Sequence, residues 1–258
     1  MTTLSLFLLF ALTTVDVDIV SLPLDRAVEV TLMPAGKAEI RREGTLTRVK
    51  VEVDRLQAPA SLGTALTTYL LWAVSPEGFL ENLGELDING NKGQLNATTR
   101  FGQLGLLITA EPHFMVDLPS SAVAYRSVGT RQEVRHMAVP VDVGMYDYSM
   151  LKPVRPGAIH VSVAQARIAI QIAENAGADR LAAQELRRAR VALASMEELQ
   201  NRAAPLELVW PAAGEAIRWS QRAVTVARTK NAERELAEVK QKLLELESQL
   251  KAARPNPQ

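Results

Sequence analysis

The chain contains no cysteine, only 5% aromatic residues and no excess of charge of either sign. The absence of cysteine excludes disulfides, thiolate metal sites, a thiol nucleophile and a lipid-modified cysteine. The 29 basic side chains balance 29 acidic side chains, so no net field attracts nucleic acid or an acidic membrane surface. We therefore predict no nucleic-acid partner.

No apolar run in the sequence is long enough to span a bilayer. Residues 4–12 read LSLFLLFAL, a length typical of the apolar core of a secretory signal peptide, although no basic residue precedes it and no A-x-A site follows. We expect residues 1–13 to be a signal peptide, the protein to be periplasmic or otherwise exported, and no transmembrane segment. The alternative is a buried first strand, because Val15, Val17 and Ile19 alternate with aspartates.

The first half of the chain alternates apolar and polar residues with a period of two. The alternation is typical of strands with one face exposed to water. Residues 67–74 (TTYLLWAV) are apolar on both faces and predict a central strand, and Asn89-Gly90 predicts a hairpin turn. We predict about seven strands in an Ig-like antiparallel β-sandwich over residues 14–126. The alternating sets include Val28, Val30 and Leu32, then Val49, Val51 and Val53, then Leu104, Leu106 and Ile108.

The period changes to 3.6 after an irregular, proline-containing connector at residues 127–160. We predict that residues 161–253 form an α-helical hairpin and a long C-terminal helix, followed by a disordered tail at 254–258, which makes the chain a two-domain α+β protein. The predicted helix boundaries rest on four signals: Ser162 in a capping box, Gly177 past the first helix, Asp179 capping the second, and Pro211 in the first turn of the third.

The end of the long helix carries a heptad pattern. Five apolar residues are spaced three, four, three and four apart, the spacing of a coiled-coil seam. A helix with such a stripe must cover it, either by association with another helix or by folding back onto the two shorter helices. We predict a protein-interaction seam formed by Leu236, Val239, Leu243, Leu246 and Leu250.

The residue patterns of common catalytic sites are missing from the sequence. The histidines His113, His136 and His160 are widely spaced, and no HExxH motif, G-x-S-x-G elbow or glycine-rich phosphate loop occurs. We therefore predict no catalytic residue, no metal site and no cofactor, and expect the protein not to be an enzyme.

Two segments resemble known families. Residues 69–78 (YLLWAVSPEG), 83–86 (LGEL) and 106–112 (LLITAEP) resemble the extracytoplasmic β-sandwich of anti-sigma-K-type factors. The sigma-binding and transmembrane parts of that family are not matched, so the resemblance implies a fold and not sigma-factor control. Residues 164–193 resemble the Ala-rich helical domain of unknown function that precedes OmpA-like domains in bacterial envelope proteins.

The two resemblances imply a bacterial cell-envelope context. We expect a non-enzymatic, exported structural or protein-interaction module that associates with itself or with a partner through its C-terminal helix. The alternative is a small-ligand or glycan-binding module of the cell envelope, in which the 127–160 segment covers an aromatic pocket. An envelope glycan is the expected ligand class in that case.

Overall fold

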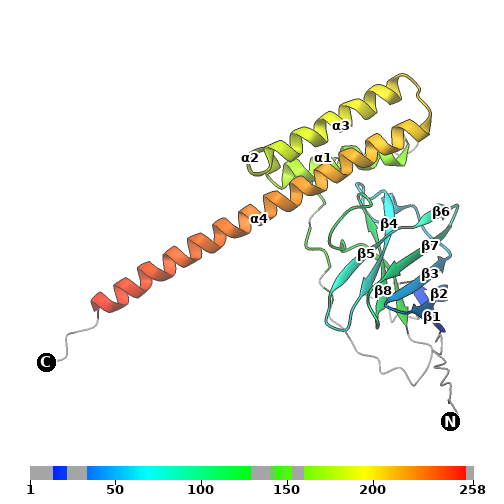
Figure 1. The fold of residues 1–258 in the computed structure, drawn as a ribbon, viewed down its shortest axis with the longest axis horizontal. Coiled ribbons are helices and arrows are strands. Elements are labelled where there is room, and N and C mark those ends of the chain that lie inside the picture. The colour runs from blue at the N-terminus through cyan, green and yellow to red at the C-terminus, as the bar shows by residue number, and fades with distance from the viewer. Residues whose placement is uncertain are drawn as a thin grey trace, which may run out of the picture. The chain divides into compact units, whose positions relative to one another are not determined.

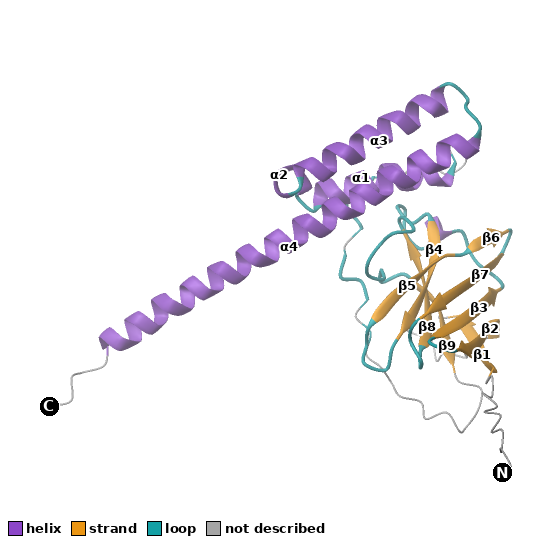
Figure 2. Cartoon of the chain, viewed as in Figure 1, coloured by secondary structure: helices purple, strands orange, loops and turns teal. Residues whose placement is uncertain are grey.

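The chain folds into two compact units, Met1–Pro153 and Val154–Gln258. The first unit contains the strands and the second contains the long helices, which confirms the mixed α+β class (Figures 1 and 2). The expected signal peptide, most of the connector, the strand residues Val28, Val30 and Leu32, and the tail lie outside the described residues. The computed structural model describes residues 14–21, 34–128, 141, 143–146, 148–152 and 160–253.

The strands of the first unit form one antiparallel sheet of nine strands within the described residues, in the order β5-β4-β8-β9-β1-β2-β3-β7-β6. Every neighbouring pair in this order is antiparallel. The strands are β1 (Thr14–Ser21), β2 (Pro34–Glu43), β3 (Leu46–Val53), β4 (Thr68–Val74), β5 (Leu80–Glu85), β6 (Asp87–Asn89), β7 (Lys92–Thr99), β8 (Gly105–Glu111) and β9 (Val123–Val128).

The sheet curves until its two ends approach each other. The Thr99 hydroxyl on β7 donates a hydrogen bond to the Glu81 carboxylate on β5, although these strands lie near opposite ends of the sheet order. The sequence predicts about seven strands in two packed sheets. In the structure the two halves of the sheet face each other across a shared interior, while the hydrogen-bonded ladder runs through all nine strands as in a nearly closed barrel.

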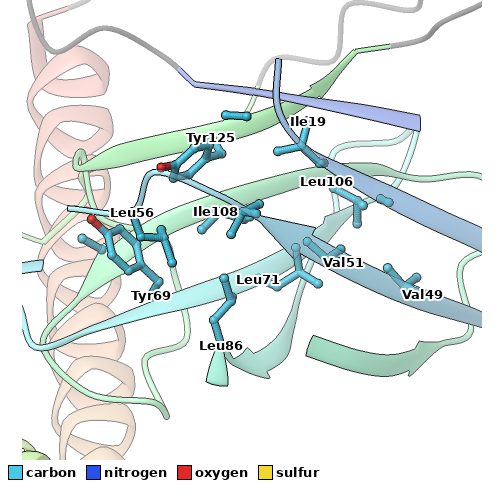
Figure 3. Packing of buried hydrophobic residues seen from close by; sticks show 14 of the residues in the cluster. Ile19, Val49, Val51, Leu56, Tyr69, Leu71, Leu86, Leu106, Ile108 and Tyr125 are labelled. Carbon is cyan, nitrogen blue, oxygen red and sulfur yellow. The ribbon is translucent and has the colours of Figure 1, made fainter. Parts of the chain in front are cut away.

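The period of two places apolar side chains inside this curved sheet. On β3 every second residue is buried, because successive side chains of a strand point to opposite faces. Figure 3 shows these residues meeting side chains from strands distant in sequence. The buried interior consists of Ile19, Ala35, Ala38, Val49, Val51, Val53, Leu56, Leu66, Tyr69, Leu71, Leu86, Leu106, Ile108, Ala110 and Tyr125.

Strand β4 is buried on both faces, as its continuous apolar run predicts. Tyr69 and Leu71 point into the interior, while Leu70 and Trp72 point to the outer face of the sheet. The outer face is covered there by Val116, with Phe114 packed against it, from the segment that follows β8. The prediction of a central strand over residues 67–74 is confirmed, since β4 lies between β5 and β8.

The predicted hairpin turn at Asn89-Gly90 joins β6 to β7. Asn89 pairs with Lys92, so Gly90 and Asn91 form the two-residue loop. Gly90 has a φ of +63°, a left-handed conformation that glycine adopts without steric cost. The sequence therefore predicted the position of the hairpin to within one residue.

The second unit contains α1 (Val161–Asn175), α2 (Ala178–Leu181), α3 (Ala183–Asn201) and α4 (Leu206–Ala253). Gly177 follows α1 with a φ of +75°, as predicted. Two cap predictions were wrong: the side chain of His160 caps α1 by accepting from the Ser162 amide, and Asp179 lies inside the first turn of α2. These boundaries shifted because several residues near each end can satisfy the same free amide groups.

Helix α4 begins at Leu206, earlier than predicted, so Pro211 lies inside the helix and not in its first turn. The first four amide groups of a helix have no hydrogen-bond partner within it, so a proline at one of those positions removes no hydrogen bond. Pro211 is the sixth residue of α4, and the carbonyl of Glu207 loses its usual donor. The helix nevertheless runs as one continuous ribbon of 48 residues (Figure 2).

Candidate interaction surface

The first part of α4 is packed into the helical unit. Its buried side chains recur three and four residues apart, and most of them are small, which lets α1 and α3 approach the α4 backbone closely. The Ser220 hydroxyl within this face donates to the Ala216 carbonyl at 2.8 Å. We call this face the packed stripe, which consists of Val209, Ala213, Ala216, Ile217, Ser220, Ala223, Val224 and Ala227.

Beyond residue 230 the helix leaves the other helices of its unit. The Lys230 ammonium donates to the carbonyl of Leu181, at the end of α2, over 2.6 Å. Residues 232–251 are all exposed. Figure 1 shows this part of α4 extending past the ends of α1 and α3. The alternative in which the segment folds back onto the shorter helices does not occur among the described residues.

The five residues of the predicted seam all lie on this exposed segment. Their exposed fractions range from 54% to 62%, whereas leucines on β4 are fully buried. The neighbouring Leu244 is equally exposed, at 66%, but lies outside the three-four spacing. We call the predicted set the leucine seam: Leu236, Val239, Leu243, Leu246 and Leu250.

A hollow of about 440 Å³ lies between α3 and α4 on the surface of the helical unit. The guanidinium carbon of Arg188 lies 4.5 Å from the centroid of the Trp219 ring, so this cation already rests against an aromatic face. The described residues that line the hollow belong to α3 and α4. Its lining residues are Arg187, Arg188, Val191, Ala192, Ser195, Ala212, Glu215 and Trp219.

A buried polar cluster lies under the segment that covers the outer face of the sheet. The Trp72 indole N–H donates to the Thr109 hydroxyl at 2.8 Å, and that hydroxyl donates to Oε1 of Glu111. The Ser120 amide donates to the same oxygen at 2.7 Å. Glu111 is fully buried, and its Oε2 has no hydrogen-bond partner among the described residues.

Burial raises the pKa of Glu111 to about 7, because a charged carboxylate loses its hydration in this position. The hydrogen bonds from Ser120 and Thr109 act in the opposite direction and are outweighed. Oε1 thus accepts two hydrogen bonds, and the raised pKa favours the protonated carboxyl group below about pH 7. The cluster connects β4, β8 and the covering segment.

The sequence patterns did not reveal that Glu111 is buried. Residues of β8 alternate, so Glu111 falls on the face opposite to Leu106 and Ile108, which the pattern predicts to be wet. Residues 114–116 cover that face only after the chain has folded. The available signal was Pro112, which follows Glu111 directly and turns the chain back over the sheet.

The two described histidines, His113 and His160, have separate structural surroundings. His113 is buried, its Nδ1 accepts from the Met115 amide at 3.2 Å, and burial lowers its pKa to about 3. His160 caps α1 and contacts the Trp210 ring, with 5.5 Å between ring centroids. His136 lies outside the described residues. No group of three or more His, Asp or Glu side chains in the described part of the chain is placed to hold a metal ion.

Comparisons with family models, curated proteins and solved structures found no match for this chain. None of the helices in the described ranges is both long and apolar enough to cross a membrane. The candidate functional site is the leucine seam, an exposed apolar stripe with heptad spacing.

Proposed function

We propose that this chain is a non-enzymatic interaction protein of the bacterial cell envelope. In this proposal the protein is exported, and its two folded units are joined to a partner through the exposed segment of α4. The apolar run at residues 4–12 supports export, and the resemblance of the helical unit to envelope proteins supports the compartment.

The observation that carries the proposal is the exposure of the leucine seam. Monomeric proteins rarely leave a long, ordered apolar stripe in water, and such stripes mark sites of association. The seam has heptad spacing and lies on a helix with no neighbour among the described residues beyond residue 230. A second helix with the same spacing would cover it by knobs-into-holes packing.

The exposed end of the helix also favours an association role over catalysis. A catalytic group needs a concave, partly dry site in which several polar groups converge. The described residues of the seam segment, 232–251, are instead all exposed on a single helix.

The proposal is tested by light scattering on the full-length protein over a range of concentrations. A single chain has a mass of 28.2 kDa, and we expect a larger mass that increases with concentration. Leu243→Glu places a charge in the seam, while Leu244→Glu places the same charge one residue away from it. Because a fully buried leucine contributes about 1.5–3 kcal/mol, only the first change should weaken association, by about tenfold or more.

A mass equal to one chain at every concentration, with no difference between the two variants, would contradict self-association. Circular dichroism of both variants checks that the helical unit remains folded. The replaced positions lie beyond the packed stripe, so the helix content of that unit should not change.

A further inference from the structure

The residues that flank the leucine seam define a heptad frame. Leu236, Leu243 and Leu250 occupy one core position, named a, and Val239 and Leu246 occupy the other, named d. The adjacent positions, e and g, lie at the edges of the seam, where charged side chains set the partner and its orientation. The charged residues at position g are Glu235 and Lys242, and those at position e are Lys240 and Glu247.

A parallel, in-register pair of these helices joins opposite charges. In that arrangement a side chain at g lies beside the e side chain of the following heptad on the other helix. Glu235 then faces Lys240 of the second copy, and Lys242 faces Glu247 of the second copy. The twofold symmetry repeats both contacts, which gives four attractive contacts and no repulsive one.

These four side chains are available for such contacts. Among the ion pairs of the described residues, none involves Glu235, Lys240, Lys242 or Glu247. All four are exposed in the structure. An ion pair with a second copy would therefore replace only contacts with water.

An antiparallel pair with Leu236 opposite Leu246 brings like charges together. In antiparallel pairs, e faces e and g faces g of the other helix, and the symmetry axis passes close to the middle of the seam. Lys240 then meets its own counterpart, and so does Lys242. Like charges held at the same interface disfavour the arrangement.

An antiparallel pair shifted by one heptad avoids that repulsion but covers the seam less well. In this register Lys240 faces Glu247 of the second copy, which gives two attractive contacts by symmetry. Leu236 is then opposite Ala253, the last residue of α4. The parallel arrangement has twice as many attractive contacts as this register.

A shift of one heptad in the other direction brings Lys240 to Glu233 and Lys242 to Glu235 of the second copy, but places Leu243 opposite Ala232 and Leu246 opposite Thr229. Only the parallel arrangement sets each of the five apolar residues against its own counterpart.

Association along the seam leaves the helical unit intact. At about 100° per residue, the centre of the leucine seam lies about 120° around α4 from the centre of the packed stripe. The seam is therefore not a continuation of the face that contacts α1 and α3. Two copies can meet at residues 236–250 without separating α4 from its own helices.

We infer that the partner of the leucine seam is a second copy of this chain, parallel and in register. The Glu235–Lys240 and Lys242–Glu247 contacts select that orientation together with the full overlap of the five apolar residues. This inference rests on the proposed function and names the partner and its alignment. The two helical units then lie at the same end of the paired helices, and the four flanking charges act as the specificity element.

The absence of cysteine from the natural chain provides a direct test of orientation. Leu236→Cys and Leu250→Cys each place one thiol near an end of the seam in the full-length protein. In a parallel, in-register pair, identical a positions face each other closely enough for a disulfide. Ala237→Cys, adjacent to Leu236 but on the outward face, is the matched control. Mild oxidation followed by non-reducing electrophoresis reports the product, and light scattering before oxidation reports the mass.

We expect both seam variants to form a covalent dimer and Ala237→Cys to remain largely monomeric on the gel, with a mass of two chains in solution. A mass of two chains without cross-linking at 236 and 250 overturns the parallel alignment and leaves the proposed self-association standing. A mass of one chain at all concentrations overturns both. A mass of three or more chains overturns the pair.

A charge exchange sharpens the test of the specificity element. The single change Lys242→Glu makes the contacts with Glu247 repulsive in the parallel pair, and the double change Lys242→Glu with Glu247→Lys restores them. We expect weaker association for the single variant and recovery for the double variant. Equal association for all three proteins would overturn the assigned role of these charges.

Discussion

Leucine and valine side chains are buried in one region of this molecule and exposed in another. Inside the curved sheet, Val49, Val51 and Leu71 are fully buried, whereas Leu236 and Leu243 on the outer part of α4 are more than half exposed. Both sets follow the period of their own secondary structure. Periodicity therefore identifies the apolar face of an element. Whether another segment of the same chain buries that face depends on where the rest of the chain lies.

The same contrast occurs along α4 itself. The packed stripe is rich in alanine, which allows α1 and α3 to lie close to the helix. The leucine seam contains only large aliphatic residues, which form knobs that need holes on a facing helix. Side-chain size thus changes along one helix. Small residues mark the surface that packs within the unit, and large residues mark the surface that is suited to a coiled coil.

The largest effect should come from removing a side chain that lies on the outer face of β4. Trp72 is fully buried, and its indole N–H is hydrogen-bonded to Thr109. We expect Trp72→Ala to lower the free energy of unfolding of the β unit by about 3–5 kcal/mol. Hydrogen exchange of the strand peptides in rising urea measures this loss. Leu244→Ala, on the exposed helix, should change exchange in the strands by less than about 0.5 kcal/mol.

If Trp72→Ala and Leu244→Ala proved equally harmless to the strands, the outer face of β4 would not be the closed, packed region described above. The contrast between a buried sheet surface and an exposed helix surface would then not hold.

A pH-dependent effect is expected from Glu111. Its pKa is about 7 in the folded state, against 4.5 ordinarily, so the folded protein holds a proton that the unfolded chain releases between these values. The resulting stabilisation is fully present below pH 4.5 and is lost as the pH rises through 7. Glu111→Gln cannot titrate and keeps the shape of the protonated group.

We expect Glu111→Gln to gain stability relative to the natural protein between pH 4.5 and pH 8, by an amount on the order of 3 kcal/mol or less. Urea titrations of the two proteins at both pH values measure the difference in their free energies of unfolding. His113 titrates in both proteins, so its contribution cancels in that difference. A difference that does not change with pH would contradict the assignment of a protonated, buried Glu111.

A smaller effect should separate the two parts of α4. Ala216 is fully buried in the packed stripe, so Ala216→Leu forces extra volume into a filled contact and should cost about 1–3 kcal/mol. Ala232 is exposed and lies one heptad before Val239, at position d. Ala232→Leu should leave the helical unit's stability unchanged and strengthen association, because it extends the leucine seam.

Thermal unfolding followed by circular dichroism measures the first effect, and the concentration dependence of the light-scattering mass measures the second. The contrast would be lost if Ala232→Leu destabilised the helical unit as much as Ala216→Leu did.

Much of the local structure could be predicted from the sequence. Alternation in Val49, Val51 and Val53 predicted an amphipathic strand, the uninterrupted run at 67–74 predicted a buried one, and Gly177 ended a helix where its left-handed conformation was needed. Each prediction depended on neighbours in sequence. The caps of α1 and α2 were wrong because several adjacent residues could satisfy the same amide groups.

The sequence by itself determined the change of period, the inward faces of β3 and β8 and the spacing of the leucine seam, because these properties follow from backbone geometry over a few residues. Only the tertiary structure decided that nine strands share one curved sheet, that the segment after β8 buries Glu111, and that α4 continues past its own unit with its seam uncovered. Those outcomes depend on which distant segments lie close together, and hydrophobic patterning marks a surface for burial without naming the segment that will bury it.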